Sequence, residues 1–194
     1  HLDTGAMYRA VALAAIRAGV PLNDPEGLDK LCSAIEIKLR DKPDGLVVLL
    51  NGEDVTEQIR TPEISTASSS VSAVSEVRRH MVRLQRELGA QGGVIAEGRD
   101  VGTVVFPNTR AKFYLDASLS ERARRRYEEL REKRADDTLE QVRAEIEQRD
   151  RNDSARSDSP LRAAKDAIRV DTTYMTPEEV VEYIAERVKE LEKD

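Results

Sequence analysis

The chain has 194 residues and a formal net charge of −6 at pH 7. This acidic balance argues against a general nucleic-acid-binding surface, because such proteins neutralise phosphates with a basic face. One cysteine and two scattered histidines exclude an intramolecular disulfide and give no zinc pattern. No apolar run approaches the roughly 18 residues of a membrane span. We therefore expect a cytoplasmic protein of one domain, or of one domain with an insertion, that binds no nucleic-acid polymer and no membrane.

The first segment predicts the end of a strand followed by a buried helix. His1-Leu2 has the character of a strand already under way, and Asp3 or Thr4 is placed to cap the helix that follows. The alanine-rich run from Ala10 to Ala18 is typical of a buried helix and ends at a glycine. Arg9 lies near the first turn, where the helix dipole is already positive. A bound anion would balance both charges, although Asp3 alone is an alternative partner.

Residues 25–34 predict a second helix, after which the pattern changes to that of an antiparallel hairpin. Residues 35–40 alternate apolar and polar side chains, residues 42–45 have the composition of a turn, and residues 46–50 form the return strand. Such a hairpin among helices and parallel strands indicates an inserted subdomain at residues 35–51. Its sequence does not indicate a function.

Two further helices are predicted between residues 61 and 88. The first begins at Thr61-Pro62, with proline at the first helical position. Serines dominate residues 65–75, which is typical either of a linker or of a small hydrogen-bonding wall that faces a ligand. Apolar residues recur among these serines at helical spacing, which favours the helix. The second helix runs from Glu76 to Leu88 and has an apolar stripe.

The chain is organised around the motif Gly93–Thr103. A short apolar run ends in the polar tip Glu97-Gly98-Arg99-Asp100, which predicts a buried parallel strand that presents side chains at its carboxyl end. Ligands bind at that edge of open α/β sheets. Arg99 has two donors suited to a phosphate, and Asp100 only accepts hydrogen bonds while ionised. An ordinary Arg-Asp pair in a strand-to-loop turn is the alternative.

The last part of the chain predicts two more strands, residues 111–116 and 167–171, and three helices. Ser118 or Ser120 caps a helix with four arginines. Its i,i+4 pairs are also typical of a solvated surface helix, and they are Glu121–Arg125, Arg124–Glu128 and Arg125–Glu129. A helix over residues 138–151 follows, and Thr176-Pro177 begins a terminal amphipathic helix. If the 138–151 helix continues, the side chains Arg149, Asp153 and Arg156 share one face, with a surface salt-bridge ladder as the alternative.

Seven strings of the sequence together resemble the bacterial cytidylate (CMP) kinases, in the nucleoside monophosphate kinase group of P-loop kinases. They are Leu2–Arg9, Asn51–Thr56, Ile59–Glu63, Glu97–Pro107, Lys112–Ser118, Glu121–Ala123 and Arg149–Asp153. Each string alone has low specificity, whereas the ordered set is highly specific and covers nearly the whole chain. The resemblance implies an α/β, three-layer P-loop kinase fold with a parallel sheet, a small antiparallel insertion and a helical lid. It implies a core of residues 1–34 and 91–194, with the lid at about 122–160, and a nucleoside monophosphate-binding region at residues 35–90.

The resemblance also implies which side chains form the site. The residues expected to line the CMP site are Thr4, Arg9, Ser69, Arg78, Arg99, Asp100, Arg149, Asp153 and Arg156, and the expected catalytic lid arginines are Arg122, Arg125 and Arg126. Their chemistry suits these tasks. Arg9 and Arg99 can clamp the acceptor phosphate bidentately, Arg156 also suits phosphate, and Arg149 with Asp153 suits the ribose hydroxyls. Asp100 can accept a hydrogen bond from the cytosine amino group, while Arg78 and Ser69 can donate hydrogen bonds to the acceptors of the cytosine ring.

The implied activity is ATP-dependent phosphorylation of CMP and dCMP to CDP and dCDP, with Mg²⁺ accompanying ATP, by a monomer of pyrimidine nucleotide metabolism. Two alternatives stay open: a non-catalytic nucleotide-binding fragment, and a kinase of the same group for another nucleoside monophosphate. Asp100 argues against uracil, because the uracil O4 is an acceptor and would face a carboxylate.

One departure from the family pattern concerns the P-loop, G-x-x-x-x-G-K-[ST]. No lysine of the sequence follows a glycine. We therefore expect the first strand and the P-loop, about one β-α-β unit of roughly 30 residues, to be missing from the sequence rather than lost by a natural pseudo-enzyme. The metal-binding hydroxyl of that loop would be missing with it, and a chain without the unit is expected to be inactive.

Overall fold

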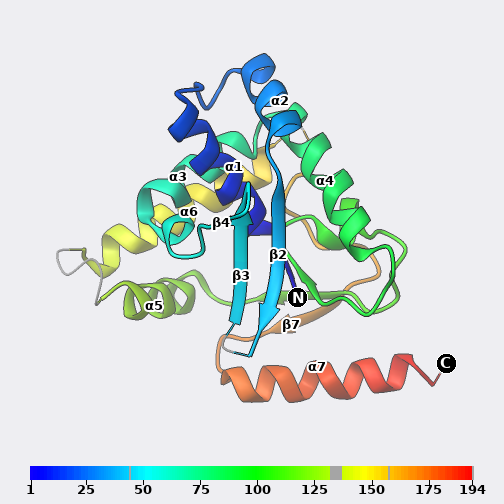
Figure 1. The fold of residues 1–194 in the computed structure, drawn as a ribbon. Helices are drawn as coiled ribbons and strands as arrows, with labels where there is room; N and C mark the ends of the chain where they lie inside the picture. The colour runs from blue at the N-terminus through cyan, green and yellow to red at the C-terminus, as the bar shows by residue number, and fades with distance from the viewer. Residues whose placement is uncertain (44, 132–136, 157, 194) are drawn as a thin grey trace. The chain divides into compact units, whose positions relative to one another are not determined.

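The computed structural model describes residues 1–43, 45–131, 137–156 and 158–193. It is a mixed α/β structure with parallel and antiparallel strand pairs (Figure 1), which confirms the predicted fold class. The chain divides into two compact units, His1–Val105 and Phe106–Asp194, which are described separately below.

The first unit begins with a short strand and a buried helix. Its elements are β1 Leu2–Asp3, α1 Thr4–Ala18, α2 Pro25–Ala34, β2 Ile37–Lys42, β3 Gly45–Leu50, β4 Glu53–Asp54, η1 Gln58–Arg60, α3 Pro62–Val71, α4 Ser75–Gly89, β5 Ala96–Glu97 and the π-helical turn η2 Val101–Val105. Asp3 caps α1 by accepting a hydrogen bond of 2.8 Å from Ala6 N. The helix ends at Gly19, whose φ of 67° is left-handed. Met7 and Val11 are fully buried, and α1 packs against α3 and η1.

Strand β5 pairs in parallel with β1, with Leu2 opposite Ala96 and Asp3 opposite Glu97. The prediction of a parallel strand at the central motif is confirmed, but the prediction that its apolar run is buried is wrong. Ile95 is 80% exposed and Val94 is 39% exposed. The physical reason is that β5 has two residues and, within the described part of the chain, pairs with β1 alone. Val94 and Ile95 therefore lie outside the paired strand, in an irregular segment that leads into it.

The predicted antiparallel hairpin is confirmed, with strands shifted by one or two residues from the prediction. Strands β2 and β3 pair antiparallel from Ile37 opposite Leu50 to Lys42 opposite Gly45 (Figure 1). A third strand, β4, adds to β3 through a turn at Asn51, with φ of 51°, and Gly52, with φ of 85°. The sequence did not predict this strand, because two residues are too few to show an alternating pattern.

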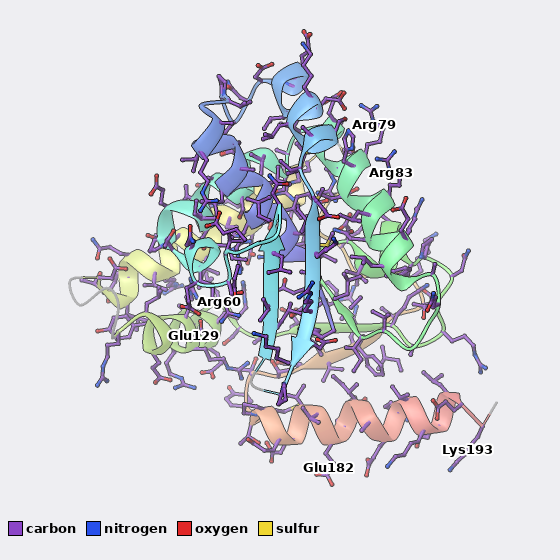
Figure 2. All side chains as sticks on the ribbon, viewed as in Figure 1. Arg60, Arg79, Arg83, Glu129, Glu182 and Lys193 are labelled. Carbon is purple, nitrogen blue, oxygen red and sulfur yellow. The ribbon has the colours of Figure 1, made fainter. Side chains whose placement is uncertain are left out.

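Helices α3 and α4 follow the insertion. The serine-rich segment is helical as far as Val71, as its apolar spacing favoured, and Thr61 caps this helix by accepting from Ile64 N. Helix α4 is amphipathic, with Val77 and Met81 buried, and it packs against α2. Arg79 and Arg83 project from its exposed face (Figure 2).

The second unit contains the other parallel pair. Its elements are β6 Phe113–Asp116, α5 Leu119–Leu130, α6 Leu139–Ala155, β7 Ile168–Asp171 and α7 Pro177–Leu191. Strands β6 and β7 pair from Phe113 opposite Ile168 to Asp116 opposite Asp171. Helices α5 and α6 pack together. Capping boxes start α6 and α7, and α7 begins at Thr176-Pro177 as the sequence predicted. Among the described helices, none combines the length and the apolar character needed to cross a bilayer.

Candidate active site

The centre of the first unit's candidate site is a buried ion pair between Arg78 of α4 and Asp100, which follows β5. A terminal nitrogen of Arg78 donates to Asp100 Oδ2, and each of the two side chains is 4% exposed. The other terminal nitrogen of Arg78 donates 3.1 Å to Ser72 O, and the guanidinium lies 5.5 Å from the centroid of the Tyr8 ring. These contacts hold Arg78 from three sides. One oxygen of Asp100 is consequently fixed by a cation that comes from a distant part of the sequence.

Thr4 and Gly98 form a second point of contact, between the start of α1 and the end of β5. Thr4 is 2% exposed, and its hydroxyl donates 2.7 Å to Glu97 O. A Cβ atom built on Gly98 would meet Thr4 Oγ1 at 2.0 Å, so only glycine permits this approach. The contact fixes where β5 ends, and hence where the following residues Arg99 and Asp100 begin.

The remaining predicted residues of the first unit lie on adjoining elements. Arg9 is half-buried on α1, and its Nε is buried without a hydrogen-bond partner among the described residues. Ser69 is half-buried on α3, the helix that packs against α1, and Arg99 is half-buried beside Asp100. The pKa of Glu97 is raised by local desolvation and by the carboxylate of Asp3, and Arg9 opposes this rise. Arg9 is therefore close enough to the carboxyl ends of β1 and β5 to influence charge there.

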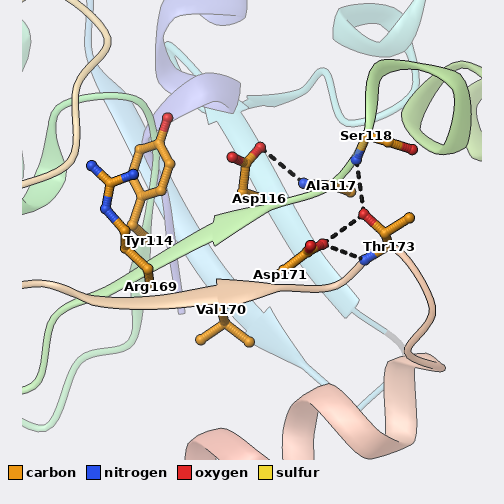
Figure 3. Close-up of a pocket in the computed structure, with 8 residues that line it drawn as sticks. All are labelled: Tyr114, Asp116, Ala117, Ser118, Arg169, Val170, Asp171 and Thr173. Carbon is orange, nitrogen blue, oxygen red and sulfur yellow. Dashed lines mark hydrogen bonds between the residues drawn. The ribbon is translucent and has the colours of Figure 1, made fainter.

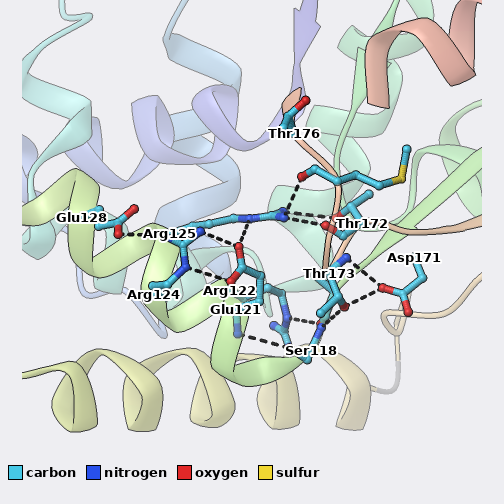
Figure 4. A network of polar contacts seen from close by, with 12 residues as sticks. Ser118, Glu121, Arg122, Arg124, Arg125, Glu128, Asp171, Thr172, Thr173 and Thr176 are labelled. Carbon is cyan, nitrogen blue, oxygen red and sulfur yellow. Dashed lines mark hydrogen bonds and ion pairs between the residues drawn. The ribbon is translucent and has the colours of Figure 1, made fainter. Parts of the chain in front are cut away.

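The three predicted lid arginines of the second unit have different partners, and Figure 4 shows two of them, Arg122 and Arg125. Arg122 donates 3.0 Å to Ala117 O and also pairs with Asp150 of α6. Arg125 donates to Thr172 O, and at 3.4 Å to Met175 O, after β7. Arg126 pairs only with the nearby Glu129 among the contacts resolved for it, at 2.9 Å. Arg122 and Arg125 thus join α5 to other elements, whereas Arg126 lies in a local surface pair.

Glu121 strengthens this arrangement on α5. It accepts from Arg124 and, at 2.8 Å, from Arg125. The hydrogen bonds from Arg124 and then from Arg125 lower the pKa of the Glu121 carboxyl to about 2. The predicted i,i+4 pair Glu121–Arg125 is confirmed. The predicted pair Arg125–Glu129 is replaced by Arg126–Glu129, because Arg125 turns toward Thr172.

Arg149, Asp153 and Arg156 lie together at the end of α6, as their spacing predicted. The helix continues to Ala155, and Arg156 is its C-terminal capping residue. Asp153 is 2% exposed and pairs with Arg156, while Arg149 Nε lies 4.0 Å from Asp153 Oδ2. Since Asp153 is buried, this cluster is not the exposed salt-bridge ladder that was the alternative.

A pocket of about 390 Å³ lies beside the strands β6 and β7 (Figure 3). Its lining residues are Tyr114, Asp116, Ala117, Ser118, Arg169, Val170, Asp171 and Thr173. Arg169 stacks 5.7 Å from the Tyr114 ring centroid, and Thr173 donates to Asp171, which lowers the pKa of that carboxyl. The sequence analysis did not identify this pocket. Its available signal was the position of Tyr114 and Asp116 on one face of a strand, two residues apart.

Within the described residues, no group of three or more His, Cys, Asp or Glu side chains is arranged to hold a metal ion.

A model of the family described as cytidylate kinase matches residues 1–190. A cytidylate kinase of Syntrophotalea carbinolica is 52% identical over 193 residues, which cover 100% of this chain and 82% of that relative. A cytidylate kinase of Geobacter sp. (strain M21) is 50% identical over 98% of this chain and 82% of its own length. A cytidylate kinase of Bacillus subtilis (strain 168) is 47% identical over 98% of this chain and 85% of its own length. With similarity of this extent along its length, the chain belongs to the cytidylate kinase family.

Proposed function

We propose that this protein transfers the γ-phosphoryl group of ATP to CMP and dCMP, with Mg²⁺ entering the reaction on ATP. The observation that supports this proposal best is the buried Arg78–Asp100 pair at the carboxyl end of β5, in a member of the cytidylate kinase family. A kinase must position two nucleotides and neutralise their spread negative charge, and it forms few covalent bonds of its own. Arginines and one base-reading carboxylate are suited to this task.

Base selection is assigned to Asp100. Arg78 occupies one carboxylate oxygen, which leaves the other as an acceptor. The exocyclic amino group of cytosine is a donor and satisfies that acceptor, whereas the O4 atom of uracil is an acceptor and opposes it. Because Asp100 is buried, an unpaired acceptor there costs more than it would in water. Asp100 therefore favours CMP over UMP.

The phosphate groups are assigned to arginines. Arg99 follows β5 by two residues, and Arg9, on α1, is close enough to Glu97 to oppose the rise of its pKa. An anion bound at this edge would also meet the N-terminal turn of α1. The planar guanidinium can donate two parallel hydrogen bonds to a phosphate. We assign Arg122, Arg125 and Arg126 to the charge that develops during phosphoryl transfer, and Arg149, Asp153 and Arg156 to the acceptor nucleotide's ribose and phosphate.

The test is Asp100→Asn in the protein expressed from its own gene. The asparagine Oδ1 can still accept from Arg78, and its amide then presents a donor to the base. We expect kcat/KM for CMP to fall by a factor of 10 or more, equivalent to about 1.5–3 kcal/mol for a hydrogen bond to a charged group, while kcat/KM for UMP falls less. Asp29→Asn makes the same chemical change outside the site and should leave both values as they are. An unchanged CMP-to-UMP ratio in Asp100→Asn would show that Asp100 does not read the base.

The proposal also predicts the wild-type substrate order. A coupled assay with CMP, dCMP, UMP, AMP and GMP should give the highest kcat/KM for the two cytosine nucleotides. A preference for AMP or GMP would show that the protein is a kinase for another nucleoside monophosphate. Binding of CMP without turnover would instead support a non-catalytic nucleotide-binding protein.

A further inference from the structure

The backbone after Asp100 folds into an unusual turn. Val101–Val105 is π-helical, and Asp100 O accepts the corresponding i+5 hydrogen bond from Val105 N at 3.3 Å, as well as bonds from Val104 N at 2.8 Å and Thr103 N at 3.2 Å. π-helical turns are rare and are frequently found at functional sites. Because Asp100 O accepts the hydrogen bonds of the turn, the backbone of Asp100 is tied directly to it.

The end of this turn is held by Arg86 of α4. Its Nη2 donates 2.7 Å to Val104 O and its Nε donates 3.1 Å to Val105 O. Two donors of one planar fork therefore bind two consecutive carbonyl oxygens, which fixes the direction of the turn as well as its position. A lysine has one ammonium group in place of this fork and reproduces the arrangement only in part.

Helix α4 thus contacts this segment at both ends. Arg78 binds the carboxylate of Asp100, and Arg86, two turns further along the same helix, binds the end of the π-helical turn. Met81, between these two contacts, and Val77, directly before Arg78, are buried and anchor the helix in the core. The helix acts as a rigid support for the residue to which we assign base recognition.

We propose that Arg86 is a positioning residue for base selection, which acts through Asp100 and does not touch the nucleotide. This inference rests on the proposed function of Asp100. A purely structural Arg86 would alter the stability of the fold without altering which base is preferred. Base preference is therefore the measurement that separates the two roles.

The experiment compares Arg86→Met with Arg86→Lys in the protein expressed from its own gene. Arg83→Met is the matched control, because Arg83 lies on the exposed face of the same helix (Figure 2) and its ion pair with Glu87 is long, at 3.9 Å. For each variant, KM and kcat are measured with CMP and UMP, and stability is measured by urea unfolding. For Arg86→Met we expect KM for CMP to rise about fivefold to tenfold and kcat to change less, as for loss of a hydrogen-bonded support. The CMP-to-UMP ratio of kcat/KM should become smaller.

Arg86→Lys should restore part of the wild-type CMP-to-UMP ratio. Arg83→Met should have the same kinetic constants as the wild type.

The double variant Arg86→Met/Asp100→Asn tests the route of the effect. If Arg86 acts through Asp100, the change in the CMP-to-UMP ratio caused by Arg86→Met should disappear once Asp100 is asparagine. An Arg86→Met protein with lower stability and an unchanged ratio would overturn the inference and leave Arg86 a structural role only. A wild type that does not prefer CMP to UMP would overturn the proposed function itself, before any Arg86 variant is considered, and the inference with it.

Discussion

Gly98 lies directly against Thr4, so that a Cβ atom on Gly98 would come within 2.0 Å of Thr4 Oγ1. The same Thr4 hydroxyl donates to Glu97 O. The close approach and the hydrogen bond together set the end of β5 against the start of α1.

Replacing Gly98 with alanine should separate these two elements. We expect the free energy of unfolding to fall by about 1–3 kcal/mol, as for other overpacked sites, and KM for CMP to rise. The measurement is urea unfolding combined with steady-state kinetics. In a Thr4→Ala background the obstructing oxygen is gone, so Gly98→Ala should cost less stability there than in the wild type. Equal costs in both backgrounds would show that Thr4 is not the obstacle.

Arg78→Met should leave the buried Asp100 carboxylate without its cation. We expect a loss of about 3–5 kcal/mol in the free energy of unfolding, the usual cost of breaking a buried pair from one side. Arg78→Met/Asp100→Leu should be more stable than the single variant, because no unpaired charge is left. The double variant should nevertheless stay inactive on CMP, although it regains stability. If it regained CMP turnover, the Arg78–Asp100 pair would not be needed for recognition of the base.

The two arginines Arg125 and Arg126 should respond differently to replacement by methionine. Arg125→Met removes the bonds to Thr172 and Met175 and should lower the free energy of unfolding by roughly 1–2 kcal/mol. Arg126→Met removes an exposed pair with Glu129 and should alter stability by less than about 0.5 kcal/mol. If Arg126 takes part in phosphoryl transfer, kcat of the Arg126→Met protein should nevertheless fall at least roughly tenfold. Unchanged kcat in Arg126→Met would remove Arg126 from the catalytic set.

Cys32 should make stability depend on pH in alkaline solution. Burial, and secondly the Asp29 carboxylate, raises the pKa of the Cys32 thiol to about 11. In the unfolded chain a thiol ionises near roughly pH 8.5, so between these values the unfolded state loses the proton first. Stability contributed by the neutral thiol is therefore present below about pH 8.5 and is lost as pH rises toward 11. Urea unfolding at several pH values should show a steeper alkaline decline for the wild type than for Cys32→Ala.

Local signals in the sequence predicted most of the elements. Asp3, Thr61 and Thr176 each cap a helix where the sequence placed one, because capping depends on side chains within three residues of the backbone groups they satisfy. The hairpin and the parallel strand at Glu97 were predicted for the same reason, since periodicity is a local property.

Long-range partners were not predictable in this way. Asp100 was assigned to a ligand from its own motif, and its pairing with Arg78 links residues separated by α4 and β5. Arg125 was paired with Glu129 by its i,i+4 spacing, yet it binds Thr172 and Met175 after β7. The exposure of Ile95 depends on which strands flank β5, a property of sheet assembly that a single apolar run does not encode.

Because Arg78 and Asp100 neutralise each other inside the fold, base choice and phosphate attraction should differ in their response to ionic strength. Dissolved salt screens exposed charges over roughly 10 Å at 0.1 M and screens buried pairs much less. Added salt should therefore weaken the binding of CMP and UMP alike through the phosphate-binding arginines. The ratio of kcat/KM for the two nucleotides should stay nearly constant, so the protein would retain its fidelity in solutions where its affinity declines.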